Sequence, residues 1–140
     1  MFIVLSFWLS EGSLPETTVK TGLIVFAHGS RVESANREVR AVTNRMVQAG
    51  GFSLVETAFL DIASPTLDEA VGLLITKGAA RVVVLPYFLT MGTHLRRDLP
   101  RIAAAASQAN HGIEIRLAAP LDGHPALAEI LVDRAREALG

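Results

Sequence analysis

Short apolar runs rich in β-branched residues alternate with longer amphipathic segments along most of the chain, from Thr21 onward. Such runs are typical of β-strands, and segments with apolar residues every three or four positions are typical of helices. Strands that alternate with helices form a mostly parallel sheet joined by right-handed crossovers. The sequence therefore predicts a single-domain, doubly wound α/β fold, with a four-stranded, mostly parallel sheet and helices on both faces.

Glycine and proline mark most boundaries of the four predicted strand–helix pairs. The third strand is almost entirely apolar, as expected of a strand that is covered on both faces. Asp98 is a plausible cap for the third helix, because Pro100 is tolerated in a first helical turn. This leaves residues 89–95 as an irregular segment. The predicted strands cover about residues 22–27, 54–60, 81–87 and 113–117, and the predicted helices cover about 34–49, 64–77, 98–110 and 125–139.

Composition excludes several classes of function. The 140 residues carry a net charge of −1, which argues against nucleic acid as a partner, because phosphate binding depends on a basic excess. Cysteine is absent from the sequence, which removes disulfides, thiolate metal ligands and cysteine nucleophiles and is consistent with a cytoplasmic protein. Neither a G-x-G-x-x-G motif nor a Walker A loop is present, so the sequence does not favour nucleotide binding.

The first 20 residues differ from the rest of the chain. Residues 1–10 are apolar and uncharged, and residues 11–20 are more polar. Ten residues are too few to cross a bilayer, which takes about 20 in a helix, so no membrane partner is expected. A basic start and a clear cleavage site, as in a secretory signal, are not evident. We therefore predict a non-essential extension or misassigned start at 1–20, with a packing arm and an export signal as alternatives, and an α/β domain at 21–140.

A side chain able to bind a metal ion or accept a proton follows each predicted strand. His28 follows the first strand, Asp61 the second, His94 the third and His124 the fourth. In an open α/β sheet, ligands bind in the crevice outside the carboxyl ends of the strands. The four groups are therefore expected to converge on one crevice.

The two histidines in the first and third of these positions are the sharpest candidates. His28 lies where a strand becomes a loop, and Gly29 after it allows a tight turn with room for a ligand. Neutral imidazole is the commonest side-chain ligand for divalent transition metals. His94 lies in a glycine-containing loop just before a helix, whose N-terminus favours anions. The alternatives are a structural role for His28, and a cap or solvated loop residue for His94.

The remaining titratable residues are less specific. Asp61 is able to accept protons or complete a coordination shell, although aspartate also begins many turns. His124 precedes a proline at a helix start, so capping is the favoured interpretation. His111 lies in a helix-to-strand loop at the opposite edge of the sheet and is assigned no role.

Two further interpretations concern residues beside the crevice. Ser30 is a possible nucleophile next to His28, as in a small hydrolase, but the G-x-S-x-G motif of α/β hydrolases is absent. Basic side chains also border the crevice, and guanidinium groups pair with carboxylates in a bidentate way. They indicate either recognition of a polyanionic ligand or an ordinary solvated helix start. The basic set is Arg31, Arg96, Arg97 and Arg101.

Several motifs occur in an order that is similar to that of a known family. They are Phe26-Ala27-His28-Gly29-Ser30-Arg31, Thr57-Ala58-Phe59-Leu60-Asp61 with Ser64-Pro65-Thr66, Lys77-Gly78-Ala79, Gly92-Thr93-His94 with Asp98-Leu99-Pro100, and Pro120-Leu121 with His124-Pro125-Ala126-Leu127. Over about residues 22–139 the chain resembles the short class II sirohydrochlorin chelatases. The resemblance implies insertion of Co²⁺ or Fe²⁺ into sirohydrochlorin, a carboxylate-rich tetrapyrrole, on the path to cobalamin or sirohaem.

The resemblance also implies roles for individual residues. His28 and His94 would bind the metal, and Asp61 would take the place of an acidic residue that is Glu in many relatives. The residues expected to bind the tetrapyrrole are Ser30, Arg31, Arg96, Arg97 and Arg101. Short members act as homodimers, and the divalent metal is a substrate, so no permanently bound cofactor is expected.

The chemistry of the residues agrees with this activity. Two imidazoles hold an ion with few, exchangeable ligands, and a carboxylate or a free imidazole can accept the two pyrrole protons. The alternatives are a Ni²⁺ chelatase, a non-catalytic metal or tetrapyrrole carrier, and the hydrolase described above.

Overall fold

The computed structural model describes residues 19–140, so nearly all of the predicted N-terminal extension lies outside the described residues. Strands and helices alternate throughout the described part, as predicted. Their bounds are β1 Thr21–Ala27, α2 Glu33–Gly50, β2 Val55–Phe59, α3 Leu67–Thr76, β3 Arg81–Pro86, α4 Thr93–Ala109, β4 Glu114–Leu117 and α5 Ala126–Leu139.

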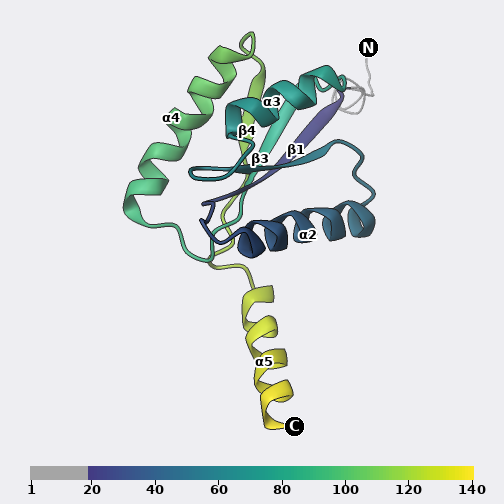
Figure 1. Ribbon diagram of the computed structural model, residues 1–140, viewed down its shortest axis with the longest axis vertical. Coiled ribbons are helices and arrows are strands. Elements are labelled where there is room, and N and C mark those ends of the chain that lie inside the picture. The colour runs from purple at the N-terminus through teal and green to yellow at the C-terminus, as the bar shows by residue number, and fades with distance from the viewer. Residues whose placement is uncertain (1–18) are drawn as a thin grey trace, which may run out of the picture.

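The four strands form one sheet in the order β2-β1-β3-β4, and every neighbouring pair is parallel. The chain steps from β1 to one edge of the sheet and then crosses back over β1 to β3. Helices α3 and α4 pack together on one face of the sheet, and α2 packs on the other (Figure 1). The prediction of a doubly wound α/β fold is thus confirmed. The reversal of strand order between β1 and β3 is the place where open α/β sheets bind ligands.

The core lies between the sheet and the α3–α4 layer. Alternate residues of β1 and β3, among them Ile24, Phe26, Val82 and Val84, are buried there, because successive side chains of a strand point to opposite faces. On the other face, the Thr57 hydroxyl donates to Thr43 of α2 across 2.8 Å. The two layers fix the strands, and with them the loops at their carboxyl ends.

Local signals set the ends of α2 and α3. Gly51 ends α2 in the left-handed conformation, with φ 71°, as predicted for a glycine beyond a helix C-terminus. Thr66 caps α3 through a capping box, in which its hydroxyl accepts from the Glu69 amide (3.2 Å) and Glu69 accepts from the Thr66 amide (2.9 Å). The helix therefore begins just after the Ser64-Pro65-Thr66 segment, whose Ser64–Pro65 peptide bond is cis.

The predicted start of the third helix was wrong. Helix α4 begins at Thr93, with Gly92 as its N-cap, and Asp98 lies inside it rather than at its cap. The apolar stripe explains the difference, because Leu95 and the buried Leu99 lie one turn apart and extend the buried face back past Asp98. Pro100 is tolerated inside the helix, although it lacks the amide that would bond to the carbonyl four residues earlier. His94 consequently lies on the first turn of a helix.

Helix α5 projects away from the sheet (Figure 1), and none of its residues is buried. Leu131 is 71% exposed, and Ile130 and Val132 are exposed as well. The helix nevertheless has an apolar stripe at helical spacing, formed by Leu127, Leu131, Ala135 and Ala138. The described part of the chain contains no helix with the length and hydrophobicity needed to cross a membrane.

Candidate functional site

The loops that follow β1 and β2 are in direct backbone contact at the carboxyl edge of the sheet. The Leu60 amide donates to the Ala27 carbonyl (2.8 Å), and the Asp61 amide donates to the His28 carbonyl (3.0 Å). Gly29 has φ 95°, and a β-carbon there would lie 2.0 Å from the Asp61 carbonyl oxygen. Only glycine allows this approach, and it brings His28 and Asp61 onto adjacent loops.

The side chains of both residues are accessible at the surface. His28 is exposed, and its Nδ1 lies 3.4 Å from the Gly29 carbonyl oxygen. The Asp61 carboxylate accepts from the Ile62 amide through Oδ1 (2.8 Å), which turns one of its oxygens toward its own loop. Ile62 has φ 72°, an uncommon conformation for a β-branched residue. The loop that carries Asp61 is therefore held in an unusual backbone shape.

His94 lies on the first turn of α4 and is exposed. Its Nδ1 lies 2.9 Å from Nη2 of Arg97, one turn further along the helix. A guanidinium group has donors and no acceptor, so Nδ1 must be the acceptor in this contact. Neutral His94 then carries its proton on Nε2.

The described residues contain no set of three histidine, aspartate or glutamate side chains placed to hold a metal ion. His28, Asp61 and His94 of one chain thus do not form a closed three-ligand site. The assignment of His28 and His94 as a pair of metal ligands stays a prediction.

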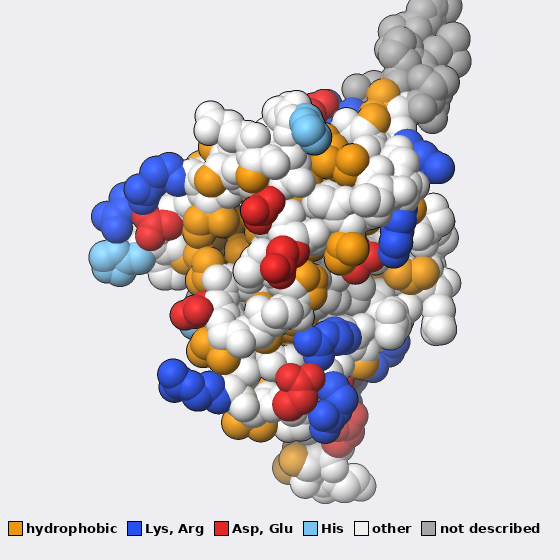
Figure 2. Space-filling model, turned by 45° about the horizontal axis from the view of Figure 1, so that its top comes forward, with side chains coloured by type: hydrophobic (Ala, Val, Ile, Leu, Met, Phe, Trp, Pro, Cys, Tyr) orange, Lys and Arg blue, Asp and Glu red, His pale blue; other side chains and the backbone are white. Residues whose placement is uncertain are grey.

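Three of the four predicted arginines are paired with carboxylates. Arg96 contacts Asp122 (2.5 Å), and both Arg97 and Arg101 contact Asp98. Hydrogen bonds from Arg101 and then from Arg97 lower the pKa of Asp98 below its ordinary value, although burial opposes them. On the face shown in Figure 2, basic side chains lie next to acidic ones rather than in one continuous patch.

Asp122 is a residue of this region that the sequence did not single out. It lies in the turn between β4 and α5, and its Oδ1 is buried without a hydrogen-bond partner among residues 19–140. Its partner Arg96 lines a cavity of about 170 Å³ at the carboxyl ends of β3 and β4, whose other walls include Pro86, Met91, Leu99, Leu117 and Pro120. Asp before glycine is an ordinary turn signal, so nothing in the sequence marked this contact.

Asn36 is another residue of this region that the sequence did not single out. Only 3% of it is exposed, and it bonds to both backbone groups of Ser30, accepting from the amide (2.9 Å) and donating to the carbonyl (2.9 Å). Ser30 in turn accepts from the Val32 amide through its hydroxyl (3.0 Å). Asn36 therefore holds the end of the His28 loop against α2.

The two other histidines lie where the sequence analysis expected them. His124 accepts from the Ala126 amide through Nδ1 (3.0 Å), which confirms its role at the start of α5. His111 lies in the turn between α4 and β4, with φ 63°. That turn precedes the strand, at the edge of the sheet opposite to the His28 and Asp61 loops.

These features define a class of protein: doubly wound α/β proteins with a candidate ligand site at the carboxyl ends of the strands. The CbiX family matches residues 22–138, and the chain belongs to this family. Most of the described part of the chain lies within this match.

Similar proteins include two with curated names. A sirohydrochlorin cobaltochelatase of Methanopyrus kandleri is 30% identical, over 84% of this chain and 96% of that protein. The chloroplastic sirohydrochlorin ferrochelatase of Arabidopsis thaliana is 34% identical over 84% of this chain, which spans only 52% of the plant protein. Among solved structures, a putative cobalamin biosynthesis CbiX protein from Marinobacter aquaeolei has a TM-score of 0.75 and 30% identity, over 85% of this chain and 97% of that chain.

Proposed function

We propose that this protein is a lyase that inserts Co²⁺ or Fe²⁺ into sirohydrochlorin, for cobalamin or sirohaem biosynthesis. The similarity to the M. kandleri sirohydrochlorin cobaltochelatase, which extends over nearly the whole of that protein, carries this proposal. The plant relative is named as a ferrochelatase, so both metals are candidates.

In this proposal His28 and His94 bind the incoming metal ion. Two imidazole ligands leave most coordination positions open, so that the ring nitrogens can replace exchangeable ligands. The exposure of both histidines supports this role, because the ion has to reach them from solvent and leave with the ring.

Asp61 is the proposed acceptor of pyrrole protons. Its position on a loop in backbone contact with the His28 loop supports this role, because a proton acceptor must lie within reach of the reacting ring. Oδ1 of its carboxylate accepts from the Ile62 amide, and the residue is exposed to a ligand arriving from solvent.

The basic side chains and Ser30 are proposed to bind the carboxylates of the macrocycle. The ion pairs of Arg97 and Arg101 with Asp98 are exposed on both sides, and such pairs contribute at most about 1 kcal/mol. A carboxylate of the substrate can therefore replace a carboxylate of the protein at low cost. Arg31 has no ion pair among residues 19–140 and is available for the same role.

We further propose that the protein works as a homodimer in the cytoplasm. The exposed apolar stripe of α5 supports an assembly of this kind, because an amphipathic helix normally buries that stripe.

A metallation assay tests the activity. Sirohydrochlorin is mixed under anaerobic conditions with Co²⁺, Fe²⁺ or Ni²⁺, with and without the protein, and the absorption spectrum is followed. A chelatase converts many equivalents of tetrapyrrole per protein, faster than the spontaneous reaction. Stoichiometric binding without turnover would instead identify a carrier, and no acceleration with any metal would contradict the proposal.

A further inference from the structure

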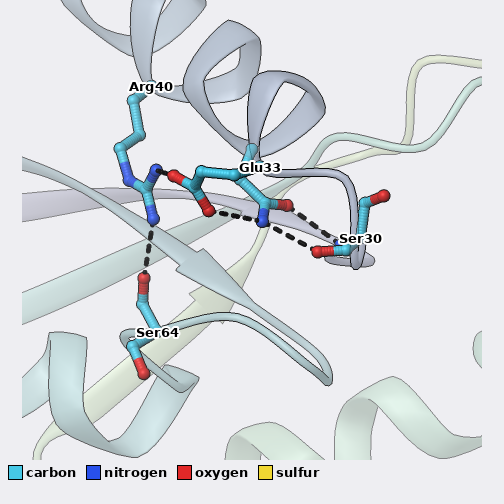
Figure 3. Close-up of polar contacts among 5 residues, drawn as sticks. Ser30, Glu33, Arg40 and Ser64 are labelled. Carbon is cyan, nitrogen blue, oxygen red and sulfur yellow. Dashed lines mark hydrogen bonds and ion pairs between the residues drawn. The ribbon is translucent and has the colours of Figure 1, made fainter.

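A chain of polar contacts runs from one candidate site loop to the other across the start of α2 (Figure 3). At one end, the buried Asn36 bonds to both backbone groups of Ser30, in the loop that carries His28. The same side chain donates from Nδ2 to Oε1 of Glu33 (3.1 Å). The first loop is thereby tied to a carboxylate on the first turn of α2.

Arg40 continues this chain of contacts to the second loop. Its Nη1 donates to Oε2 of Glu33 (2.9 Å), and its Nη2 donates to the carbonyl oxygen of Ser64 (3.1 Å). The guanidinium group also lies over the Phe59 ring, with Cζ 5.2 Å from the ring centroid. Ser64 belongs to the loop between β2 and α3, which carries Asp61.

The chemistry of the two charged residues suits a bridge between loops. Hydrogen bonds from Asn36 and then from Arg40 lower the pKa of Glu33, so the carboxylate is ionised at neutral pH and accepts from both neighbours. The planar guanidinium group donates hydrogen bonds to two acceptors on different elements at once. A single ammonium group does not reproduce this geometry. The bridge thus requires both an anionic Glu33 and an arginine at residue 40.

A second pair on the same helix provides a comparison. Arg45 pairs with Glu38 across 3.3 Å, with the same sequence spacing as Arg40 and Glu33. Both of its side chains are more than 60% exposed, whereas only 38% of the Arg40 side chain is exposed. Arg40 differs from Arg45 by its bond to the Ser64 carbonyl and its stacking on Phe59.

From these contacts we infer that Arg40 is a positioning residue, which fixes the loop of Asp61 relative to the loop of His28. It acts through Glu33 and Asn36 on one side and through Ser64 on the other. Misplacement of a reacting group by about 1 Å costs up to about a hundredfold in rate, so a loop held from both sides matters for proton removal. The catalytic part of this inference rests on the proposed function, and the structural part does not.

The test compares Arg40→Met with Arg45→Met, since each removes one charge and one ion pair from α2. Hydrogen–deuterium exchange is measured over residues 59–66 in the full-length protein. We expect exchange in this segment to become about tenfold faster in Arg40→Met and to stay at the wild-type rate in Arg45→Met. Equal exchange in the two variants would overturn the inference.

Steady-state kinetics of metal insertion give the second readout. We expect kcat to fall about tenfold in Arg40→Met, while KM for Co²⁺ stays within about twofold of the wild-type value, because metal binding is assigned to other residues. An unchanged kcat despite faster exchange would overturn the catalytic part. If the wild-type protein shows no chelatase activity, the proposed function fails, and the exchange data still decide whether Arg40 fixes the loop.

Arg40→Lys covers the case in which Arg40→Met does not fold. Lysine keeps the charge and the long stem over Phe59 but cannot hold both acceptors in the same fork. Exchange over residues 59–66 should be faster than in the wild-type protein and kcat should be lower, each by less than about tenfold, because the charge and the stem are kept. Wild-type behaviour of Arg40→Lys in both measurements would show that charge alone suffices and would contradict the bridging geometry.

Discussion

Arg97 donates a hydrogen bond to Nδ1 of His94 across 2.9 Å, so the lone pair of this ring nitrogen is already engaged. A metal ion binds to an unprotonated ring nitrogen. If the ion takes Nδ1, it displaces Arg97; if it takes Nε2, the proton moves to Nδ1 and turns the acceptor into a donor. In both cases the contact between Arg97 and His94 must break before His94 binds metal.

Removal of this competing donor should strengthen metal binding at His94. An exposed hydrogen bond of this kind contributes about 0.5–1 kcal/mol, so Arg97→Met is expected to bind Co²⁺ about threefold more tightly in a calorimetric titration. Arg101→Met is the matched control, because Arg101 also pairs with Asp98 but has no contact with His94. Equal affinity in both variants would show that Arg97 does not compete with the metal.

Substitution of the proposed metal ligands should abolish metal insertion. His28→Ala and His94→Ala are each expected to lower kcat/KM for Co²⁺ by at least about a hundredfold, because each removes half of the proposed ligand set. His111→Asn is the control, since asparagine tolerates the positive φ of this residue. Similar activity in all three variants would contradict the assignment of the site.

Gly29→Ala should destabilise the fold more than an ordinary glycine substitution. The added β-carbon would lie 2.0 Å from the Asp61 carbonyl oxygen, and the backbone has φ 95°. Gly123→Ala separates the two effects, because Gly123 has φ 87° but nothing within 4 Å of the added carbon. We expect a loss of about 1 kcal/mol in the free energy of unfolding for Gly123→Ala and of about 3 kcal/mol or more for Gly29→Ala, measured by urea titration. Equal losses would mean that the two loops move apart readily.

Acid should weaken the link between Glu33 and Arg40. The folded-state pKa of Glu33 is lowered from an ordinary value of 4.5, so its contribution to stability is present above 4.5 and is lost as pH falls through the lowered value. The midpoint of urea unfolding, followed downward from pH 6, should therefore fall less in Glu33→Gln than in the wild-type protein. Glu38→Gln removes the same charge from the same helix and controls for net charge. An identical pH dependence of Glu33→Gln and wild type would contradict this expectation.

A charge in the apolar stripe of α5 should prevent assembly if this helix forms the proposed dimer. Leu131→Glu alters a side chain that is 71% exposed, so the fold of one chain should not change. Sedimentation velocity is expected to give a dimer for the wild-type protein and a monomer for Leu131→Glu. Arg136→Glu places the same side chain on the polar side of the helix and should remain a dimer. A dimeric Leu131→Glu variant would exclude the apolar stripe of α5 as the interface.

The sequence was most informative where structure depends on local pattern. The strands β1, β2 and β3 and the helix α2 lie within one or two residues of their predicted bounds, because apolar periodicity and terminal glycines act over a few residues. The start of α4 was predicted too late because prolines are common in the first turn of a helix, and Pro100 therefore suggested a start at Asp98. The buried Leu99 favours the earlier start that the structure shows. Burial on the completed sheet outweighed this local signal.

Contacts between distant segments could not be predicted from the sequence. The sequence predicted that His28, Asp61 and His94 follow their strands. It did not predict that Arg96 pairs with Asp122 or that Arg40 bonds to Ser64. These contacts depend on how loops far apart in the chain meet. A helix over about residues 125–139 was predicted correctly, but an amphipathic pattern does not specify which surface the apolar side contacts.

The close approach of Gly29 to Asp61 also limits how the two loops can change in length. Because the backbones of the two loops are in contact, a residue inserted into or deleted from the first loop would disturb its contact with the second. At the carboxyl ends of β1 and β2, new variants are therefore expected to arise by exchange of side chains at constant loop length, or by a paired change of length in both loops. A library that randomises one of these loops with variable length should yield few folded proteins.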